Sequence, residues 1–367
     1  MNEATVDSIR VGVYEVPTDQ PEADGTLAWD KTTVVIVEVD AAGLTGLGYT
    51  YAAGACKPLI DDTLAAVVLG RSAYDVPGAW EAMVRAIRNL GRPGLVSCAI
   101  SAVDAALWDL KAKLVDLPLC RLLGTVHPDV PIYGSGGFTT YDDDATRRQI
   151  ERWVGEWGIP RVKIKIGQSW GHATGRDLAR VALTRQLAGA ETAVYVDANG
   201  GYSRKQAIRV AAAMQDHAVT WFEEPVSSDD LSGLGEIRAQ TSIDIAAGEY
   251  GYSLVYFDRM IRAGAVDCLQ VDVTRCGGIT EWVRVAALAA AAGLEVSGHC
   301  APNLHAHVAA SVPNLRHLEY FHDHVRIEDL FFDGALDPTG GSLHPDQGRP
   351  GLGLVLRSAD AEHYRVG

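Results

Sequence analysis

The 367-residue sequence predicts an α/β fold in which a (β/α) barrel follows a smaller α+β domain. Short apolar segments typical of strands recur in the middle of the chain at the length of a strand plus a helix, and each ends in a polar or charged side chain. The successive end residues lie 26, 26, 23, 27 and 20 positions apart. Because the carboxyl ends of parallel barrel strands surround one mouth, these side chains are expected to converge. They are Asp197, Glu223, Glu249, Asp272, His299 and Glu319.

The region before the barrel is predicted to form strands followed by helices. Residues 5–16 and 32–40 alternate in the manner of strands, and 43–51 continues them through glycine turns. Apolar helical patterns follow near 58–69, 77–90 and 97–115, which is the order typical of an α+β domain.

A link near 124–131 that contains glycine and proline precedes the first predicted barrel strand. After 321–332 the sequence loses helical periodicity and becomes rich in glycine and proline. We therefore place the domains at 1–127, 128–330 and 331–367. The predicted barrel strands are 130–137, 161–167, 194–200, 220–225, 244–249, 267–273, 295–300 and 315–321.

Three carboxylates among the strand-end residues predict a metal site. Asp197, Glu223 and Glu249 would repel one another at one mouth, and a divalent cation removes that conflict. Their oxygens are hard ligands, which favours Mg²⁺ or Mn²⁺ over zinc. A single strand-end carboxylate often caps the next helix instead, but three at this spacing favour a shared ion.

The second predicted strand carries two lysines on one face. Lys163 and Lys165 alternate with Ile164 and Ile166, so both lysines point into the barrel if the isoleucines pack against the helices. Neighbouring ammonium groups depress each other's pKa, which can leave one lysine as a free amine near neutral pH and hence as a usable general base. Two lysines on a solvated edge are the alternative.

Across the barrel, an aspartate and a histidine end adjacent strands. Asp272 ends the sixth strand and His299 the seventh, which brings their side chains within hydrogen-bond reach. The carboxylate would orient the imidazole and stabilise its protonated form. We expect this pair to act as a second general acid/base that faces the lysines.

The combined pattern resembles the enolase superfamily, specifically its mandelate racemase subgroup. The resemblance covers essentially the whole chain and includes 97-SCAISAVDAALWDLKAK, which is similar to a helix signature of the family's amino-terminal region. It implies a (β/α)7β barrel whose mouth is capped by the amino-terminal domain, with the C-terminal tail packed on that domain. It also implies that loops at 17–29 and 49–55 close over the mouth and decide specificity.

The family pattern also implies roles for individual residues. For the metal, it selects Glu223 rather than Glu224 from the doublet, together with Asp197 and Glu249. Glu319 would help to stabilise negative charge if it carries or shares a proton. The implied catalytic residues are Lys163, Lys165, Asp272, His299 and Glu319. The substrate-binding residues are Lys163, Ser135, Asn199 and Glu319.

These groups suit abstraction of the α-proton of a carboxylate substrate. That proton is too weakly acidic for lysine or histidine to remove unaided, so stabilising charge must already be in place. From the resemblance we favour dehydration of a sugar acid to a 2-keto-3-deoxy acid, with a racemase or epimerase of a 2-hydroxy acid as the alternative. A non-catalytic barrel would lack one or more of Lys165, Asp272 and His299, and all three are present.

Composition excludes several other classes of protein. A net charge of -15 argues against nucleic acid or an anionic membrane as a partner. The resemblance implies a small carboxylate substrate, and a homo-oligomer is expected. No apolar run is long enough to span a bilayer and the start shows no signal peptide, so a cytoplasmic location is expected. The six cysteines lack CxxC spacing and are interpreted as reduced thiols in the core.

Several histidines have no predicted catalytic role. His305 and His307 form an HxH pair, but they follow the seventh strand where a helix is expected. His322 and His324 follow Glu319 and are expected to lie in a loop near the mouth.

Overall fold

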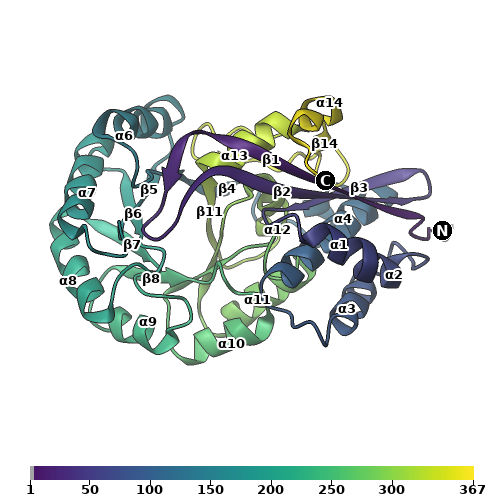
Figure 1. The fold of residues 1–367 in the computed structure, drawn as a ribbon, viewed down its shortest axis with the longest axis horizontal. Helices are drawn as coiled ribbons and strands as arrows, with labels where there is room; N and C mark the ends of the chain where they lie inside the picture. Colours follow the sequence, from purple (N-terminus) through teal and green to yellow (C-terminus); the bar gives the residue numbers. More distant parts are fainter. Residues whose placement is uncertain (1–3) are drawn as a thin grey trace.

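The computed structural model describes residues 4–367 and shows a small domain beside a barrel (Figure 1). The predicted order of strands followed by helices is confirmed in the small domain. Its antiparallel sheet has the order β1 (Ser8–Ala23), β2 (Ala28–Ala41) and β3 (Leu44–Thr50). Its helices are α1 (Cys56–Leu59), α2 (Ala65–Val68), α3 (Val76–Ala86), α4 (Leu95–Leu114) and α5 (Leu119–Leu123), with a π-helical turn over Ile60–Leu64 between α1 and α2.

Helix α4 lies close against the sheet because β3 carries glycines where the two backbones meet. A Cβ atom at Gly48 would lie 2.2 Å from Ala102 O, and one at Gly46 would lie 2.1 Å from Ala106 O. Side chains such as Val37 of β2 are fully buried in the apolar cluster of this domain. The small domain therefore has a core of its own.

Within residues 4–367, eight parallel strands close into a barrel, because β11 pairs with β4 as well as with β10. This confirms the predicted (β/α)7β barrel. The strands are β4 (Val130–Gly136), β5 (Arg161–Lys165), β6 (Ala193–Asp197), β7 (Val219–Glu223), β8 (Asp244–Ala247), β9 (Cys268–Val271), β10 (Glu295–Gly298) and β11 (Leu315–Phe321). The helices between them are α6 (Asp143–Ile150), α7 (Thr174–Ala188), α8 (Arg204–Met214), α9 (Leu231–Arg238), α10 (Leu254–Arg262), α11 (Ile279–Ala291) and α12 (Pro302–Ala309).

Alternation along the strands separates the barrel interior from the helix layer. In β5, Val162 and Ile164 belong to the main apolar core, whereas Lys163 and Lys165 are buried among polar side chains inside the barrel. Nearer the amino ends of the strands, a separate apolar cluster fills the interior. It consists of Tyr133, Tyr195, Trp221, Ala246 and Cys268.

Strands β1 and β2 extend from the small domain as a hairpin that reaches across the barrel mouth (Figure 1). At the hairpin tip, Gly25 O accepts a hydrogen bond at 2.9 Å from Trp170 N, which lies in the barrel segment between β5 and α7. A Cβ atom at Gly25 would lie 2.6 Å from Ile166 O, so this glycine allows the tip to contact the barrel backbone. We expected a loop over 17–29, but residues 17–23 and 28–29 belong to strands β1 and β2, which pair here at Glu22–Trp29 and Ala23–Ala28.

The C-terminal segment contacts the small domain, as the resemblance implies. Val366 N donates to Val13 O at 2.8 Å, and Leu352 N donates to Asp109 Oδ1 at 2.6 Å. The proposed boundaries after residues 127 and 330 remain predictions. The elements of this region are α13 (His322–Phe331), β12 (Phe332–Asp333), β13 (Ser342–Leu343), β14 (Val355–Leu356) and α14 (Ser358–Ala361).

Two further sequence predictions concern the whole chain. None of the helices between residues 4 and 367 is long and apolar enough to cross a membrane. All six cysteines are buried and unpaired in the same range, which agrees with their interpretation as reduced thiols.

Candidate active site

The three predicted metal ligands meet at the barrel mouth. Asp197 and Glu223 are the last residues of β6 and β7, and Glu249 follows the end of β8 by two positions. One carboxylate oxygen from each lies within 4.8 Å of the other two, and each residue is at most 3% exposed. We refer to Asp197, Glu223 and Glu249 as the carboxylate cluster.

The two members of the glutamate doublet lie in different surroundings. Glu223 Oε2 accepts hydrogen bonds from Trp221 Nε1 at 3.0 Å and Gln270 Nε2 at 2.9 Å inside the barrel. Burial and the neighbouring Asp197 raise its pKa to about 8. Glu224 has a φ of +37°, which interrupts strand alternation, and it lines a separate cavity. Geometry therefore places Glu223, and not Glu224, in the carboxylate cluster.

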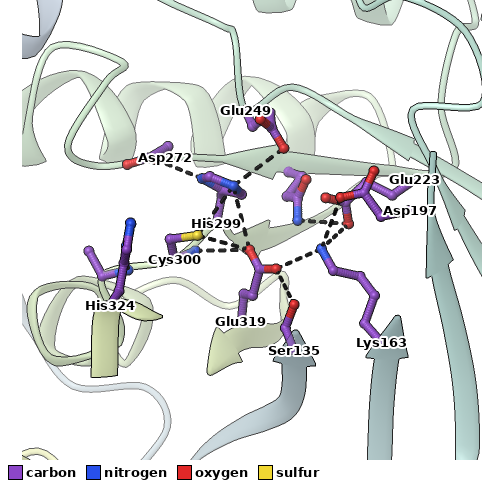
Figure 2. Close-up of polar contacts among 12 residues, drawn as sticks. Ser135, Lys163, Asp197, Glu223, Glu249, Asp272, His299, Cys300, Glu319 and His324 are labelled. Atoms are coloured by element: carbon purple, nitrogen blue, oxygen red, sulfur yellow. Dashed lines mark hydrogen bonds and ion pairs between the residues drawn. The ribbon is translucent and has the colours of Figure 1, made fainter. Parts of the chain in front are cut away.

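Both lysines are held as ammonium groups by nearby carboxylates. Lys163 Nζ lies 2.6 Å from Glu223 Oε2 and 2.7 Å from Glu319 Oε1, and Lys165 Nζ lies 2.5 Å from Asp197 Oδ2 (Figure 2 shows the contacts of Lys163). Burial lowers the pKa of each lysine, but attraction to these carboxylates outweighs burial and raises it. The expectation that mutual repulsion produces a free amine is therefore wrong for this arrangement.

The predicted dyad is formed. His299 Nδ1 lies 2.7 Å from Asp272 Oδ2, while Asp272 Oδ1 accepts bonds from Thr274 N at 2.6 Å and Thr274 Oγ1 at 2.7 Å. Burial lowers the pKa of His299, but Glu249, Glu319 and Asp272 together raise it. The imidazole is thus oriented by Asp272 and favoured in its protonated form.

Glu319 lies between the lysine side and the histidine side of the site (Figure 2). Its Oε1 accepts a bond from Ser135 Oγ at 2.6 Å, and its Oε2 accepts one from Cys300 N at 3.1 Å. Burial raises its pKa, but Lys163 and His299 lower it well below its usual range. The surroundings of Glu319 therefore favour its ionised form, which does not support the expectation that it carries or shares a proton. Ser135 is fully buried and uses its hydroxyl on Glu319.

A cavity of about 390 Å³ connects the barrel mouth to the small domain. Lys165, Asn199 and His299 line it from the barrel, and Trp29 and Tyr51 line it from the small domain. Its volume suits a small molecule. The predicted loop at 49–55 therefore contributes to the mouth, and Asn199 is placed where it can contact a substrate.

The HxH pair is structural, as expected from its position on a helix. His305 Nδ1 lies 2.8 Å from Cys300 O, and His307 Nδ1 accepts a bond from Cys120 N at 3.4 Å within the buried part of α12. Neither residue joins any metal-binding group found among residues 4–367.

The other two histidines begin helix α13 rather than lying in a loop. His324 lines the cavity and stacks on Tyr51, with ring centroids 3.4 Å apart. His322 Nε2 lies 3.1 Å from Asp19 Oδ2 of the hairpin. Both histidines therefore join the barrel to the small domain.

Comparison with known families identifies the evolutionary group. Residues 8–124 match the N-terminal domain of the mandelate racemase / muconate lactonizing enzyme family, and residues 145–361 match the Enolase C-terminal domain-like family. The chain belongs to the enolase superfamily. The resemblance inferred from the motifs is thereby confirmed.

This enolase-superfamily chain has relatives that match it over nearly its full length. It is 47% identical to a mandelate racemase/muconate lactonizing enzyme-like protein from Rubrobacter xylanophilus, whose crystal structure gives a TM-score of 0.95 with 99% of this chain and 100% of that chain covered. It is 32% identical to 3,6-anhydro-α-L-galactonate cycloisomerase from Streptomyces coelicolor, with 96% of this chain and 97% of the relative covered.

A third relative is L-talarate/galactarate dehydratase from Salmonella typhimurium, at 30% identity with 96% of this chain and 89% of the relative covered. A crystal structure of a mutant L-talarate/galactarate dehydratase contains magnesium and L-glucarate, and it gives a TM-score of 0.91 with 28% identity, covering 100% of this chain and 93% of that chain. The relatives of this superfamily member thus include both a cycloisomerase and a dehydratase.

The carboxylate cluster of this superfamily member fits Mg²⁺. Its donors are all hard oxygens, which Mg²⁺ prefers. Glu223 Oε1 and Glu249 Oε2 are buried and accept no hydrogen bond within residues 4–367, although His299 Nε2 lies 3.3 Å from Glu249 Oε2. An ion at the cluster would satisfy these two oxygens.

Sequence reasoning missed Arg275. Its Nη1 lies 3.2 Å from Glu249 Oε1, and its Nε lies 3.4 Å from Asp272 Oδ2. Arg275 lies only three positions after Asp272, so its place in the loop after a catalytic strand was an available signal.

Sequence reasoning also assigned Cys300 to the core, although it lines the cavity. Its Sγ lies 3.3 Å from His299 Nε2 and 3.4 Å from Glu319 Oε2. Its position directly after His299 was the signal in this case.

Proposed function

We propose that this chain catalyses the Mg²⁺-dependent dehydration of a sugar acid to a 2-keto-3-deoxy acid. The observation that carries the proposal is that Lys165 and His299 line one cavity beside the carboxylate cluster. Lys165 ends β5 and His299 follows β10, and these strands are three steps apart in the ring of eight. The two proton-transfer groups therefore approach a bound substrate from different sides.

The charges around the substrate suit removal of an α-proton. Asp197, Glu223 and Glu249 would hold the cation, which supplies positive charge where negative charge develops on the substrate carboxylate. Lys163 is fully buried behind this cluster and adds a second positive charge. Lys165 is less strongly attracted to Asp197 when that carboxylate is a metal ligand, so its pKa falls toward the range of a usable base.

In the proposed reaction, Lys165 removes the proton from carbon 2 of the substrate. His299, which Asp272 keeps oriented and protonated, donates a proton from Nε2 to the hydroxyl on carbon 3. That hydroxyl leaves as water, and the resulting enol converts to the 2-keto-3-deoxy acid. The ionised Glu319, 3.6 Å from His299 Nε2, stabilises the imidazolium before the transfer.

The comparisons support this proposal without deciding the substrate. One relative at 30% identity is a sugar-acid dehydratase, and a dehydratase of that name has been crystallised with magnesium and L-glucarate. A small carboxylate substrate, a homo-oligomeric state and a cytoplasmic location remain part of the proposal.

Racemisation or epimerisation is the second candidate, because the same opposed groups favour it. If His299 returns a proton to carbon 2 from the other face, the product is an epimer and no water is lost.

A library of acid sugars with Mg²⁺ separates the two candidates. We expect at least one sugar acid to yield a 2-keto acid, detected as its semicarbazone, with no reaction in the presence of a chelator. If the library gives only epimers, as seen by NMR, the dehydratase proposal is wrong and the second candidate holds.

A further inference from the structure

Three side chains beside the carboxylate cluster form a second group of potential metal ligands, with different chemistry. They are His299, Cys300 and Glu319, and each is at most 5% exposed. The distances are 3.3 Å from Sγ to Nε2, 3.4 Å from Sγ to Oε2 and 3.6 Å from Nε2 to Oε2. Figure 2 shows these three side chains turned toward one another.

These three distances match the edges of a tetrahedral zinc site. Zinc lies about 2.3 Å from a thiolate sulfur and about 2.0–2.2 Å from imidazole nitrogen or carboxylate oxygen. Ligand atoms at tetrahedral angles around such an ion are therefore roughly 3.3–3.7 Å apart. All three distances fall within that range. His299 and Cys300 both line the cavity, so an ion can reach them from it.

The surroundings orient the three ligand atoms. His299 Nδ1 contacts Asp272 at 2.7 Å, which leaves Nε2 as the ligand atom, and a carboxylate in this position is typical of zinc-bound histidines. Cys300 N donates to Glu319 Oε2 at 3.1 Å and orients that carboxylate.

The backbone at Cys300 is also unusual. Cys300 and Ala301 have φ values of +52° and +39°, a region that residues other than glycine rarely adopt. Such strain is concentrated at functional sites. Here it follows directly after β10 and accompanies the approach of Sγ to His299.

We propose that His299, Cys300 and Glu319 form a binding site for a softer divalent cation, Zn²⁺ or Cd²⁺, with a ligand set different from that of the carboxylate cluster. The two sites are neighbours, because His299 Nε2 also lies 3.3 Å from Glu249 Oε2. Thiolate and imidazole prefer these ions, whereas three carboxylates prefer Mg²⁺. When the ion binds, Cys300 releases its thiol proton to solvent and a sulfur–metal bond forms without any change of oxidation state. The site itself does not depend on the proposed function. Only its consequence does: a metal on Nε2 prevents His299 from transferring a proton, so turnover stops.

Cadmium titration of the full-length, Mg²⁺-loaded protein tests the site directly, because a thiolate bound to cadmium has an ultraviolet charge-transfer band. We expect wild type to develop this band with one ion per chain and to lose it when Zn²⁺ is added. Cys300→Ser should lack the band. Cys98→Ser removes a similarly buried thiol from the small domain and should retain it.

Two further variants locate the ion. Removing a residue that only hydrogen-bonds to a metal ligand weakens metal binding by about 10–100-fold. His299 is itself a proposed ligand, so His299→Gln should weaken Cd²⁺ binding at least about tenfold. Glu223→Gln alters the carboxylate cluster and should leave the Cd²⁺ band in place.

The proposal is overturned if wild type shows no band, if the band persists in Cys300→Ser, or if Glu223→Gln abolishes it. Far-ultraviolet circular dichroism checks that each variant is folded. Cys300→Gly, which suits the positive φ, replaces Cys300→Ser if the latter does not fold. The readout is spectroscopic, so failure to find a sugar-acid substrate leaves this test unaffected.

Discussion

Arg275 pairs with Glu249 of the carboxylate cluster, with Nη1 3.2 Å from Oε1. The same guanidinium lies 3.4 Å from Asp272 Oδ2 and stacks over the ring of Tyr250. A single cation thus contacts both the carboxylate cluster and the dyad. Arg275 is a positioning residue for both sides of the site.

Replacing Arg275 should change the titration of the dyad. Arg275 lowers the pKa of His299, so Arg275→Gln should raise that pKa and move the corresponding limb of the pH–rate profile to higher pH. Arg275→Lys keeps the charge and should largely restore the profile. Arg284→Gln removes an arginine that contacts Glu281 outside the site, and it should leave the profile unchanged. An unshifted limb in Arg275→Gln would show that the arginine does not act on His299.

The carboxylate cluster should account for Mg²⁺ binding. Asp197→Asn, Glu223→Gln and Glu249→Gln should each abolish turnover and weaken Mg²⁺ binding, measured by calorimetry. Asp197 and Glu223 also pair with the buried Lys165 and Lys163, so Asp197→Asn and Glu223→Gln should lower the melting temperature without metal. Circular dichroism checks that each variant is folded at the assay temperature.

Glu224→Gln is the matched control for the doublet. Burial and the nearby Glu249 raise the pKa of Glu224 well above its usual value, so the neutral amide should replace a neutral carboxyl at little cost. A loss of Mg²⁺ affinity equal to that of Glu223→Gln would mean that Glu224 is the ligand.

The two proton-transfer groups should be separable in D2O. Lys165→Ala should retain exchange of the α-proton for substrates whose proton faces His299, and His299→Asn should retain it for the opposite configuration. Asp272→Asn should resemble His299→Asn more weakly, because it removes only the orienting carboxylate. NMR of recovered substrate measures the exchange. Equal exchange at the same face by Lys165→Ala and His299→Asn would contradict the opposed arrangement.

The sequence could predict the barrel and its mouth because strand-end residues at a regular period must converge once parallel strands close into a ring. Asp197, Glu223 and Glu249 meet for that reason, and Asp272 contacts His299 because β9 and β10 are neighbours. These predictions depend on topology alone, which periodicity reveals.

The sequence predictions that the structure contradicts depend on contacts between residues from different strands. The lysine prediction considered only the spacing of Lys163 and Lys165 along one strand, whereas Glu223, Glu319 and Asp197 come from other strands and decide the pKa values. The hairpin segment at 17–29 contains turn-forming residues typical of a loop, but pairing between β1 and β2 overrides that local preference.

One buried carboxyl in the hairpin should make stability depend on pH. Glu22 is fully buried with a hydrogen bond from Trp29 Nε1 at 2.9 Å, and burial together with Asp323 raises its pKa from 4.5 to about 9. Folding therefore favours the protonated form. The stabilisation that protonated Glu22 gives to the folded state is complete below pH 4.5, the ordinary pKa of the carboxyl, and is lost as pH rises toward about 9.

Glu22→Gln should remove that dependence. Between about pH 5 and pH 7, wild type should lose about 3 kcal/mol more of its free energy of unfolding than the variant does, since each pKa unit corresponds to about 1.4 kcal/mol. Urea denaturation at several pH values measures the difference. Parallel pH dependence in the two proteins would show that Glu22 is ionised in the folded state.

The central claim is that this site removes the α-hydrogen of a carboxylate substrate with the help of a metal. Mass spectrometry of the product from a sugar acid deuterated at carbon 2, identified in the library screen, tests it most directly. We predict that the deuterium is lost from carbon 2 in the presence of Mg²⁺, and that no product forms when a chelator is present or when Glu223 is replaced by glutamine. A product that retains the deuterium at carbon 2, or that forms equally well with chelator, would contradict the account.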